Sequence, residues 1–156
     1  MKILFLDIDG VLNSHASMLA LGLSWPQDNP KAVNLNPVAV GLLKEICKEC
    51  DLHIYVHSTW STQSKEWFTE MFKHYGFDAK VLEREHASIL DVDRNERIDV
   101  AIEHYRPEQF IVLDDDDVCS KFGERFILTD SRNGLGWEHY EKALALFGKQ
   151  VPVILM

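Results

Sequence analysis

The sequence predicts an α/β fold in which a mainly parallel sheet is covered by helices on both faces. Short apolar runs of strand length alternate along the chain with longer segments of helical periodicity. The short runs are apolar at nearly every position, which indicates strands that are buried on both faces. Alternation of this kind is typical of a parallel sheet whose helices cross between consecutive strands.

The first predicted strand covers residues 2–7, with the continuous apolar run ILFL at its centre. A long loop follows it. Asn36 and Pro37 then indicate a helix start, because asparagine is a favoured N-cap and proline fits the first helical turn. Apolar residues continue at helical spacing as far as Cys50.

A second, shorter strand is predicted over residues 52–58, LHIYVHS. The helix after it is expected between Ser61, a candidate N-cap, and Gly76, a candidate C-terminal stop. Residues 80–82 form a weak candidate strand before a polar stretch.

The second half continues the same alternation. A helix is predicted over residues 95–105, strands over 109–113 and 125–129, and a last helix over 136–148, and residues 151–156 are a candidate edge strand. The chain contains no internal repeat, low-complexity tract or linker. We therefore expect one domain over residues 1–156.

The amino-acid composition disfavours two classes of protein, those that span a membrane and those that bind nucleic acid through their overall charge. Hydrophobic residues make up 46% of the 156 residues and charged residues 26%, as in soluble globular proteins. The balance of 16 basic against 25 acidic residues, a net charge of −9, disfavours a protein that binds nucleic acid through its overall charge. No apolar run approaches the length of a membrane span and no secretory signal is visible, so we expect a cytoplasmic protein without a membrane partner.

Three cysteines leave at least one thiol unpaired. Cys47 and Cys50 lie late in a predicted helix, where residues three apart share a face. A zinc site would need a second cysteine pair, which the chain lacks. We interpret these cysteines as packing residues and not as a redox or zinc pair.

Polar residues end three of the predicted strands. Asp7 and Asp9 end the first strand, Ser58 ends the second, and Asp114 and Asp115 follow the run FIVL. Ligands of parallel α/β sheets bind at the carboxyl ends of the strands. We therefore expect these side chains to converge at one edge of the sheet.

Converging carboxylates are costly unless a cation neutralises them, and oxygen ligands of this kind suit Mg²⁺. One carboxylate beside the metal can attack phosphorus and form an aspartyl-phosphate. An acid two residues away can protonate the leaving oxygen and then activate water. Gly10 allows the chain to turn sharply away from the cleft, and the Ser58 hydroxyl with a fixed cation can hold the phosphoryl oxygens.

Each feature alone has a simpler interpretation. The Asp-x-Asp-Gly stretch can be a solvated turn, and Ser58 can merely cap the next helix. Asp116 and Asp117 are expected to be helix-capping acids. The tryptophans are expected to pack, with only Trp60 beside the proposed site, and the histidines show no metal-ligand spacing.

Three stretches resemble motifs of the haloacid dehalogenase (HAD) superfamily. FLDIDGVLN resembles its first motif, IYVHSTW its second and FIVLDDDD its fourth, in the family's order over nearly the whole chain. The resemblance implies a Rossmann-like three-layer sandwich. The third motif, a basic residue before the last of these strands, has two candidates, Arg94 and Arg97. In the small HAD domains that this chain resembles, the basic residue stands four residues before an apolar helix residue, and Arg94, four before Ile98, fits this better.

The resemblance also implies roles for individual residues. Asp7 would be the nucleophile and a metal ligand, and Asp9 would be the acid/base, offering its backbone carbonyl to the metal. The implied catalytic residues are Asp7, Asp9, Ser58 and Arg94. The implied phosphate- or substrate-binding residues are Gly10, Ser58, Thr59 and Arg94. The implied Mg²⁺ ligands are Asp7, Asp9, Asp114 and Asp115.

Within the superfamily, STW, RNERI and GLGWEHYEKALAL resemble small HAD domains associated with RNA repair. That group often reads STWR, whereas this chain has Ser61 after Trp60. The segments after the first and second motifs are too short for a large cap domain. An open cleft suits a phosphate on a large substrate, or a cleft covered by oligomerisation, and the oligomeric state is left open.

These observations predict a Mg²⁺-dependent phosphohydrolase that acts through an aspartyl-phosphate, with nucleotides or nucleic-acid ends as candidate substrates. The alternative is a non-catalytic HAD-like module that binds phosphate or a partner in the same cleft. A response-regulator receiver is disfavoured, because its phospho-accepting aspartate precedes the strand-end Ser or Thr, whereas Ser58 here precedes the later acidic cluster.

Overall fold

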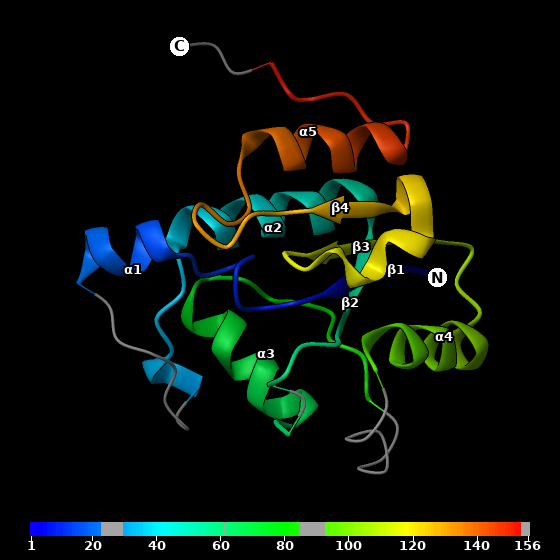
Figure 1. Cartoon of the computed structure of the whole chain (residues 1–156), viewed down its shortest axis with the longest axis horizontal. Helices are drawn as coiled ribbons and strands as arrows, with labels where there is room; N and C mark the ends of the chain where they lie inside the picture. Colours follow the sequence, from blue (N-terminus) through cyan, green and yellow to red (C-terminus); the bar gives the residue numbers. More distant parts are fainter. Residues whose placement is uncertain (23–29, 61, 85–92, 154–156) are drawn as a thin grey trace.

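The computed structural model describes residues 1–22, 30–60, 62–84 and 93–153. Four parallel strands form its sheet in the order β2-β1-β3-β4 (Figure 1). The strands are β1 (Lys2–Leu6), β2 (Leu52–Val56), β3 (Gln109–Asp114) and β4 (Phe126–Leu128). The predicted α/β fold with a parallel sheet is thus confirmed.

The helices form the outer layers of the sandwich. They are α1 (His15–Leu21), α2 (Pro37–Cys50), α3 (Lys65–His74), α4 (Arg94–Tyr105) and α5 (Trp137–Leu146), with 3₁₀ segments η1 (Pro30–Ala32) and η3 (Asp117–Arg125). Helices α2 and α5 lie side by side along the sheet, and α4 lies on the far side of it from them (Figure 1). The described residues contain no cap domain, as predicted, and no helix among them is long and apolar enough to cross a membrane.

Strand β1 shows why the apolar runs are continuous. Successive side chains of a strand point to opposite faces. Leu4 and Leu6 pack into the hydrophobic cluster that contains residues of α2, α3 and α5, and Ile3 and Phe5 pack into a second cluster with residues of α4 and η3. All four side chains are fully buried, so both faces of the strand require apolar residues.

Two helix boundaries test the capping predictions. Asn36 caps α2 as expected, and its side chain accepts a hydrogen bond of 3.0 Å from the Val38 N–H. Helix α3 is capped by Ser64 and not by Ser61, because the Ser64 hydroxyl accepts the Trp67 N–H at 3.1 Å and helical geometry begins only at Lys65. Ser61 itself lies outside the described residues.

Other boundaries shift by a few residues. The predicted strand at 80–82 is only an isolated bridge between Val81 and Ile54. Helix α3 ends at His74, and Gly76 follows with a positive φ of 71°, as expected of a helix stop. Residues 151–153 form no strand, and the rest of the expected edge strand, 154–156, lies outside the described residues.

Candidate functional site

The carboxyl edge of the sheet brings three acidic side chains together. Asp114 is the last residue of β3 and Asp115 follows it, while Asp7 follows β1 directly. The Asp7 N–H donates to the Leu113 carbonyl at 2.9 Å, which continues the pairing of the two strands past the end of β1. Carboxylate oxygens of the three aspartates lie within 4.8 Å of one another. The predicted convergence of these acids is therefore present in the fold.

Of the three carboxyl groups, that of Asp7 has its ionised form most strongly disfavoured by its surroundings. Its side chain is buried, and its Oδ1 has no hydrogen-bond partner in the described part of the chain. Burial, together with the nearby charge of Asp114, raises the pKa of Asp7 to about 8 against the partial compensation of Arg94. An unpaired buried oxygen beside two further carboxylates fits a divalent cation with oxygen ligands, as Mg²⁺ prefers.

Arg94 is a basic side chain that reaches this acidic cluster. It is the first residue of α4, and its Nη1 lies 2.7 Å from Asp114 Oδ1 and 3.3 Å from Asp7 Oδ2. Arg97, one turn later, instead places its Nη1 3.5 Å from the backbone carbonyl of His57. The geometry agrees with the choice of Arg94 from the helix spacing, and its role in the reaction stays a prediction.

Asp9 lies apart from the acidic cluster and is held by two side chains. Its Oδ1 accepts a hydrogen bond of 2.8 Å from Asn13 Nδ2, and its Oδ2 accepts one of 2.7 Å from the indole N–H of Trp60. Both donors come from outside the sheet, Asn13 from the turn after β1 and Trp60 from the loop after β2. Neither contact was predicted, although the position of Trp60 beside the site was.

Two features of the structure require glycine at position 10: its positive φ angle and the close approach of the Asp115 carboxylate. Its φ of +74° lies in the left-handed region, which favours glycine. A Cβ at this position would stand 2.1 Å from Asp115 Oδ2. The glycine thus leaves the space that the Asp115 carboxylate occupies beside the Asp-x-Asp-Gly turn.

Ser58 is fully buried at the end of β2, and its hydroxyl oxygen accepts the Trp60 N–H at 3.0 Å. It does not cap α3, because Ser64 does. Thr59, the next residue, lines a surface hollow of about 340 Å³ together with Arg94 and Arg97. Thr59 thus shares this hollow with Arg94, and phosphate binding by Ser58 and Thr59 stays a prediction.

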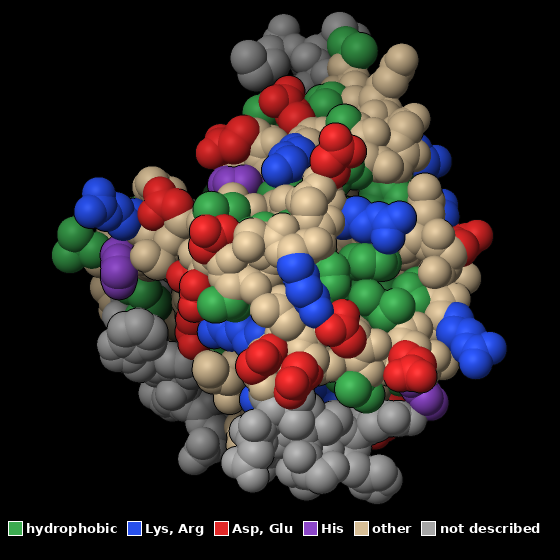
Figure 2. Space-filling model, turned by 45° about the vertical axis from the view of Figure 1, so that its right-hand side comes forward, with side chains coloured by type: hydrophobic (Ala, Val, Ile, Leu, Met, Phe, Trp, Pro, Cys, Tyr) green, Lys and Arg blue, Asp and Glu red, His purple; other side chains and the backbone are tan. Residues whose placement is uncertain are grey.

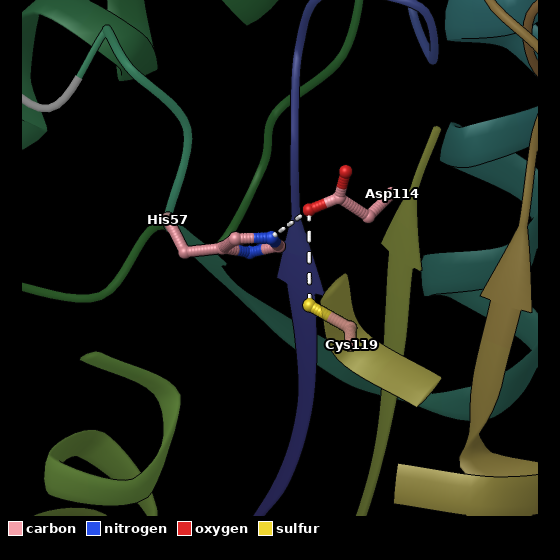
Figure 3. Close-up of side chains that lie close together, drawn as sticks. All are labelled: His57, Asp114 and Cys119. Atoms are coloured by element: carbon pink, nitrogen blue, oxygen red, sulfur yellow. Dashed lines mark hydrogen bonds and ion pairs between the residues drawn. The ribbon is translucent and has the colours of Figure 1, made fainter. Parts of the chain in front are cut away.

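A buried histidine contacts Asp114, one of the three acids of the cluster (Figure 3). His57 follows β2 directly, and its Nε2 lies 2.8 Å from Asp114 Oδ2. A carboxylate only accepts hydrogen bonds, so this nitrogen carries the proton. Cys119 Sγ lies 3.9 Å from the same oxygen, and all three side chains are buried.

The pKa values of the two buried aspartates, Asp7 and Asp114, are shifted in opposite directions. Burial acts to raise the pKa of Asp114, but the hydrogen bonds and charges of its partners outweigh burial and hold that pKa below its usual value. The pKa of His57 is lowered by its burial, which favours the neutral ring. Both oxygens of Asp114 are held by protein donors, whereas Asp7 Oδ1 has no hydrogen-bond partner among the described residues and is therefore the freer oxygen for a cation.

Sequence reasoning did not identify His57, because it shows no metal-ligand spacing to another histidine. A usable signal was its place at the end of a buried apolar run, next to Ser58. The acids after Asp115 differ slightly from expectation: Asp116 stands at the N-cap position of η3 without a side-chain capping bond, and Asp117 lies in the first turn.

The three cysteines are free and buried, in agreement with packing roles; they are Cys47, Cys50 and Cys119. Burial raises the pKa of all three thiols, that of Cys50 to about 11 and that of Cys119 to about 12. Thiols of this kind are unreactive near neutral pH.

Comparison with known proteins agrees with this geometry. Residues 3–140 match the family described as the HAD domain in Swiss Army Knife RNA repair proteins. No curated protein and no solved structure matches the chain. The matched segment runs from β1 into α5 and includes every residue of the acidic cluster. The chain therefore belongs to the HAD domains of Swiss Army Knife RNA repair proteins.

Proposed function

We propose that this HAD domain is a Mg²⁺-dependent phosphohydrolase that acts through an aspartyl-phosphate intermediate. The observation that carries the proposal is the buried Oδ1 of Asp7, which has no hydrogen-bond partner among the described residues and belongs to a cluster that also contains Asp114 and Asp115. Mg²⁺ held by Asp7 and Asp115, with Asp114 beside them, would neutralise phosphoryl oxygens and keep Asp7 ionised.

The residues of this chain then divide the reaction between them. An oxygen of Asp7 attacks phosphorus while the bond from phosphorus to the leaving oxygen breaks, and Asp9 transfers a proton to that oxygen. Asp9 next takes a proton from a water molecule, which attacks phosphorus and releases phosphate from Asp7. Arg94 balances negative charge at the phosphoryl group, as this kind of transfer requires.

The candidate binding residues surround that reaction centre. Ser58 and Thr59 follow β2 at the same edge of the sheet, and Gly10 places backbone close to the acids. We assign the phosphoryl oxygens to these groups together with Arg94, because hydroxyl, amide and guanidinium groups all donate hydrogen bonds to phosphate.

For the substrate we propose a phosphorylated nucleotide or nucleic-acid end. The family description points to RNA repair, and the absence of a cap among the described residues leaves the site open to a large substrate. The net charge is −9, and on the face shown in Figure 2 acidic and basic side chains are interspersed. Recognition would therefore depend on the terminal phosphate and its neighbourhood more than on a long stretch of backbone.

The test uses wild type, Asp7→Asn and Asp9→Asn, with Asp117→Asn as the control for loss of an exposed acid in the same acidic run. Each protein is incubated with p-nitrophenyl phosphate and with 3′- or 5′-phosphorylated oligonucleotides in Mg²⁺ or EDTA. Phosphate release is measured, and acid-quenched protein is weighed by mass spectrometry. We expect Mg²⁺-dependent release by wild type and by Asp117→Asn.

The two site variants should fail differently. Asp9→Asn should accumulate a phosphate adduct with p-nitrophenyl phosphate, because the good leaving group needs little protonation but water is no longer activated. Asp7→Asn should form no adduct. An adduct on Asp7→Asn alone would reverse the two roles. A wild type that releases no phosphate from any substrate would favour a phosphate- or partner-binding module instead.

A further inference from the structure

Both carboxylate oxygens of the acid/base candidate Asp9 accept hydrogen bonds from neutral side chains. Asn13 Nδ2 lies 2.8 Å from Oδ1, and Trp60 Nε1 lies 2.7 Å from Oδ2. Both distances are short for N–H···O bonds, as expected when the acceptor is a carboxylate. The two bonds fix the position and the plane of this side chain.

The rest of the fold holds each donor in turn. Asn13 is buried, and its Oδ1 accepts the Gly10 N–H at 3.0 Å. That bond determines the orientation of the amide, since a backbone N–H must face its oxygen, and Nδ2 is thereby turned toward Asp9.

Trp60 is held at both its backbone and its ring. Its backbone N–H donates to Ser58 Oγ at 3.0 Å. Its ring packs edge-to-face on Trp67 of α3, with centroids 6.0 Å apart. The indole N–H is a donor only, so it can stabilise an acceptor but cannot take the proton itself.

We propose that Trp60 and Asn13 are positioning residues that hold Asp9 ready for proton transfer to the leaving oxygen, an inference that rests on the proposed function. Each carboxylate oxygen has two lone-pair positions, and each donor uses one of them. A proton can therefore occupy a remaining position on Asp9, pass to the leaving oxygen as its bond to phosphorus breaks, and be replaced from the attacking water.

Positioning makes a prediction that simple structural support does not. Proton transfer matters most when the leaving group is a poor one, because a good leaving group departs as an anion without help. If a hydrogen-bond donor to Asp9 is removed, the resulting drop in kcat/KM should therefore be larger for a substrate with a poor leaving group. A merely structural loss should lower the reaction of every substrate alike.

The experiment compares kcat/KM for p-nitrophenyl phosphate and for β-glycerol phosphate, a phosphate monoester with a poor alkoxide leaving group. Trp60→Phe keeps an aromatic ring and removes the N–H. We expect it to lower kcat/KM about 10-fold or more for the alkyl phosphate and less than about threefold for the aryl phosphate, as part of the roughly 10²–10⁴-fold that general acids contribute. Trp67→Phe, which alters the same aromatic cluster without touching Asp9, should leave the ratio of the two substrates unchanged.

A spectroscopic measurement that does not use Trp60→Phe keeps the inference testable if that variant folds poorly, and a double variant tests the coupling if it folds well. In ¹H–¹⁵N spectra of the wild type, the Trp60 indole N–H should resonate downfield and exchange slowly, and Asp9→Ala should abolish both properties. In the Asp9→Asn background, Trp60→Phe should no longer change the ratio of the two substrates.

The outcomes separate the two proposals. Two results would overturn the positioning role and leave the proposed phosphohydrolase activity intact. One is an equal drop in kcat/KM of Trp60→Phe for both substrates, and the other is a Trp60 indole N–H resonance that does not change in Asp9→Ala. A wild type without any hydrolysis would overturn the proposed function and this inference with it.

Discussion

Replacing Asp7 with asparagine should stabilise the metal-free protein even though it removes the proposed nucleophile. Asp7 is buried beside Asp114, and its pKa is raised from 3.8 to about 8. The folded protein therefore keeps a proton on Asp7 at pH values where the unfolded chain has lost it. Folding becomes less favourable as the pH rises from about 4 to about 8, and the effect levels off above that range.

The magnitude follows from the two pKa values. At pH 7 the difference between the pH and the unfolded pKa of 3.8 corresponds to up to about 4 kcal/mol, at about 1.4 kcal/mol per pKa unit. Asparagine has the same shape, carries no charge, and can donate its amide to the neighbouring carboxylates. Asp7→Asn should therefore gain a few kcal/mol over wild type at pH 7 to 8 and almost nothing near pH 4.

Urea unfolding in EDTA at pH 4.5, 6 and 8 measures this difference. Asp9→Asn is the matched control, because Asp9 is only partly buried and both its oxygens are hydrogen-bonded, so it should gain no stability. Adding Mg²⁺ should raise the stability of wild type by mass action and leave Asp7→Asn nearly unchanged. An Asp7→Asn protein that is equally or less stable than wild type at pH 8 without metal would refute the reasoning.

Three further predictions concern the neighbours of Asp7. Arg94→Ala should lower kcat about 10²-fold or more, and Arg97→Ala should lower it far less, because Arg94 contacts the acidic cluster whereas Arg97 lies at the backbone carbonyl of His57; a larger loss in Arg97→Ala would reverse the assignment. Gly10→Ala should destabilise the protein by about 2 kcal/mol or more and weaken Mg²⁺ activation, since its Cβ would meet the Asp115 carboxylate, and unchanged melting and Mg²⁺ titration curves would contradict this. His57→Phe should lose more activity than His57→Gln, which keeps a donor, as steady-state rates with saturating Mg²⁺ will show.

Much of the candidate site follows from local sequence. The continuous apolar runs predicted a sheet buried on both faces, and a parallel sheet gathers its strand ends at one edge, so Asp7 and Asp114 had to meet. The choice of Arg94 over Arg97 came from the resemblance to the small HAD domains, in which the basic residue stands four residues before an apolar helix residue. Ile98 lies on α4 and is fully buried, and a residue one turn before it shares its face of the helix.

The helix start of α3 shows where local reasoning fails. Ser61 and Ser64 are both good N-caps by residue type, and both precede the same apolar pattern. In the structure Ser64 is the N-cap of α3, and the helix that begins after it buries Phe68 and Phe72 in the core. Capping adds about 1 kcal/mol, whereas burying two phenylalanines contributes several times as much.

The sequence by itself determined which strands end in carboxylates and which helix face carries the arginine, because both depend on periodicity within one element. The tertiary structure decided which side chains support those groups. The contacts of Trp60 with Asp9 and of His57 with Asp114 join residues 51 and 57 positions apart. They exist because β2 and β3 flank β1 in the sheet, and strand order is a property of the packed fold that no local pattern encodes.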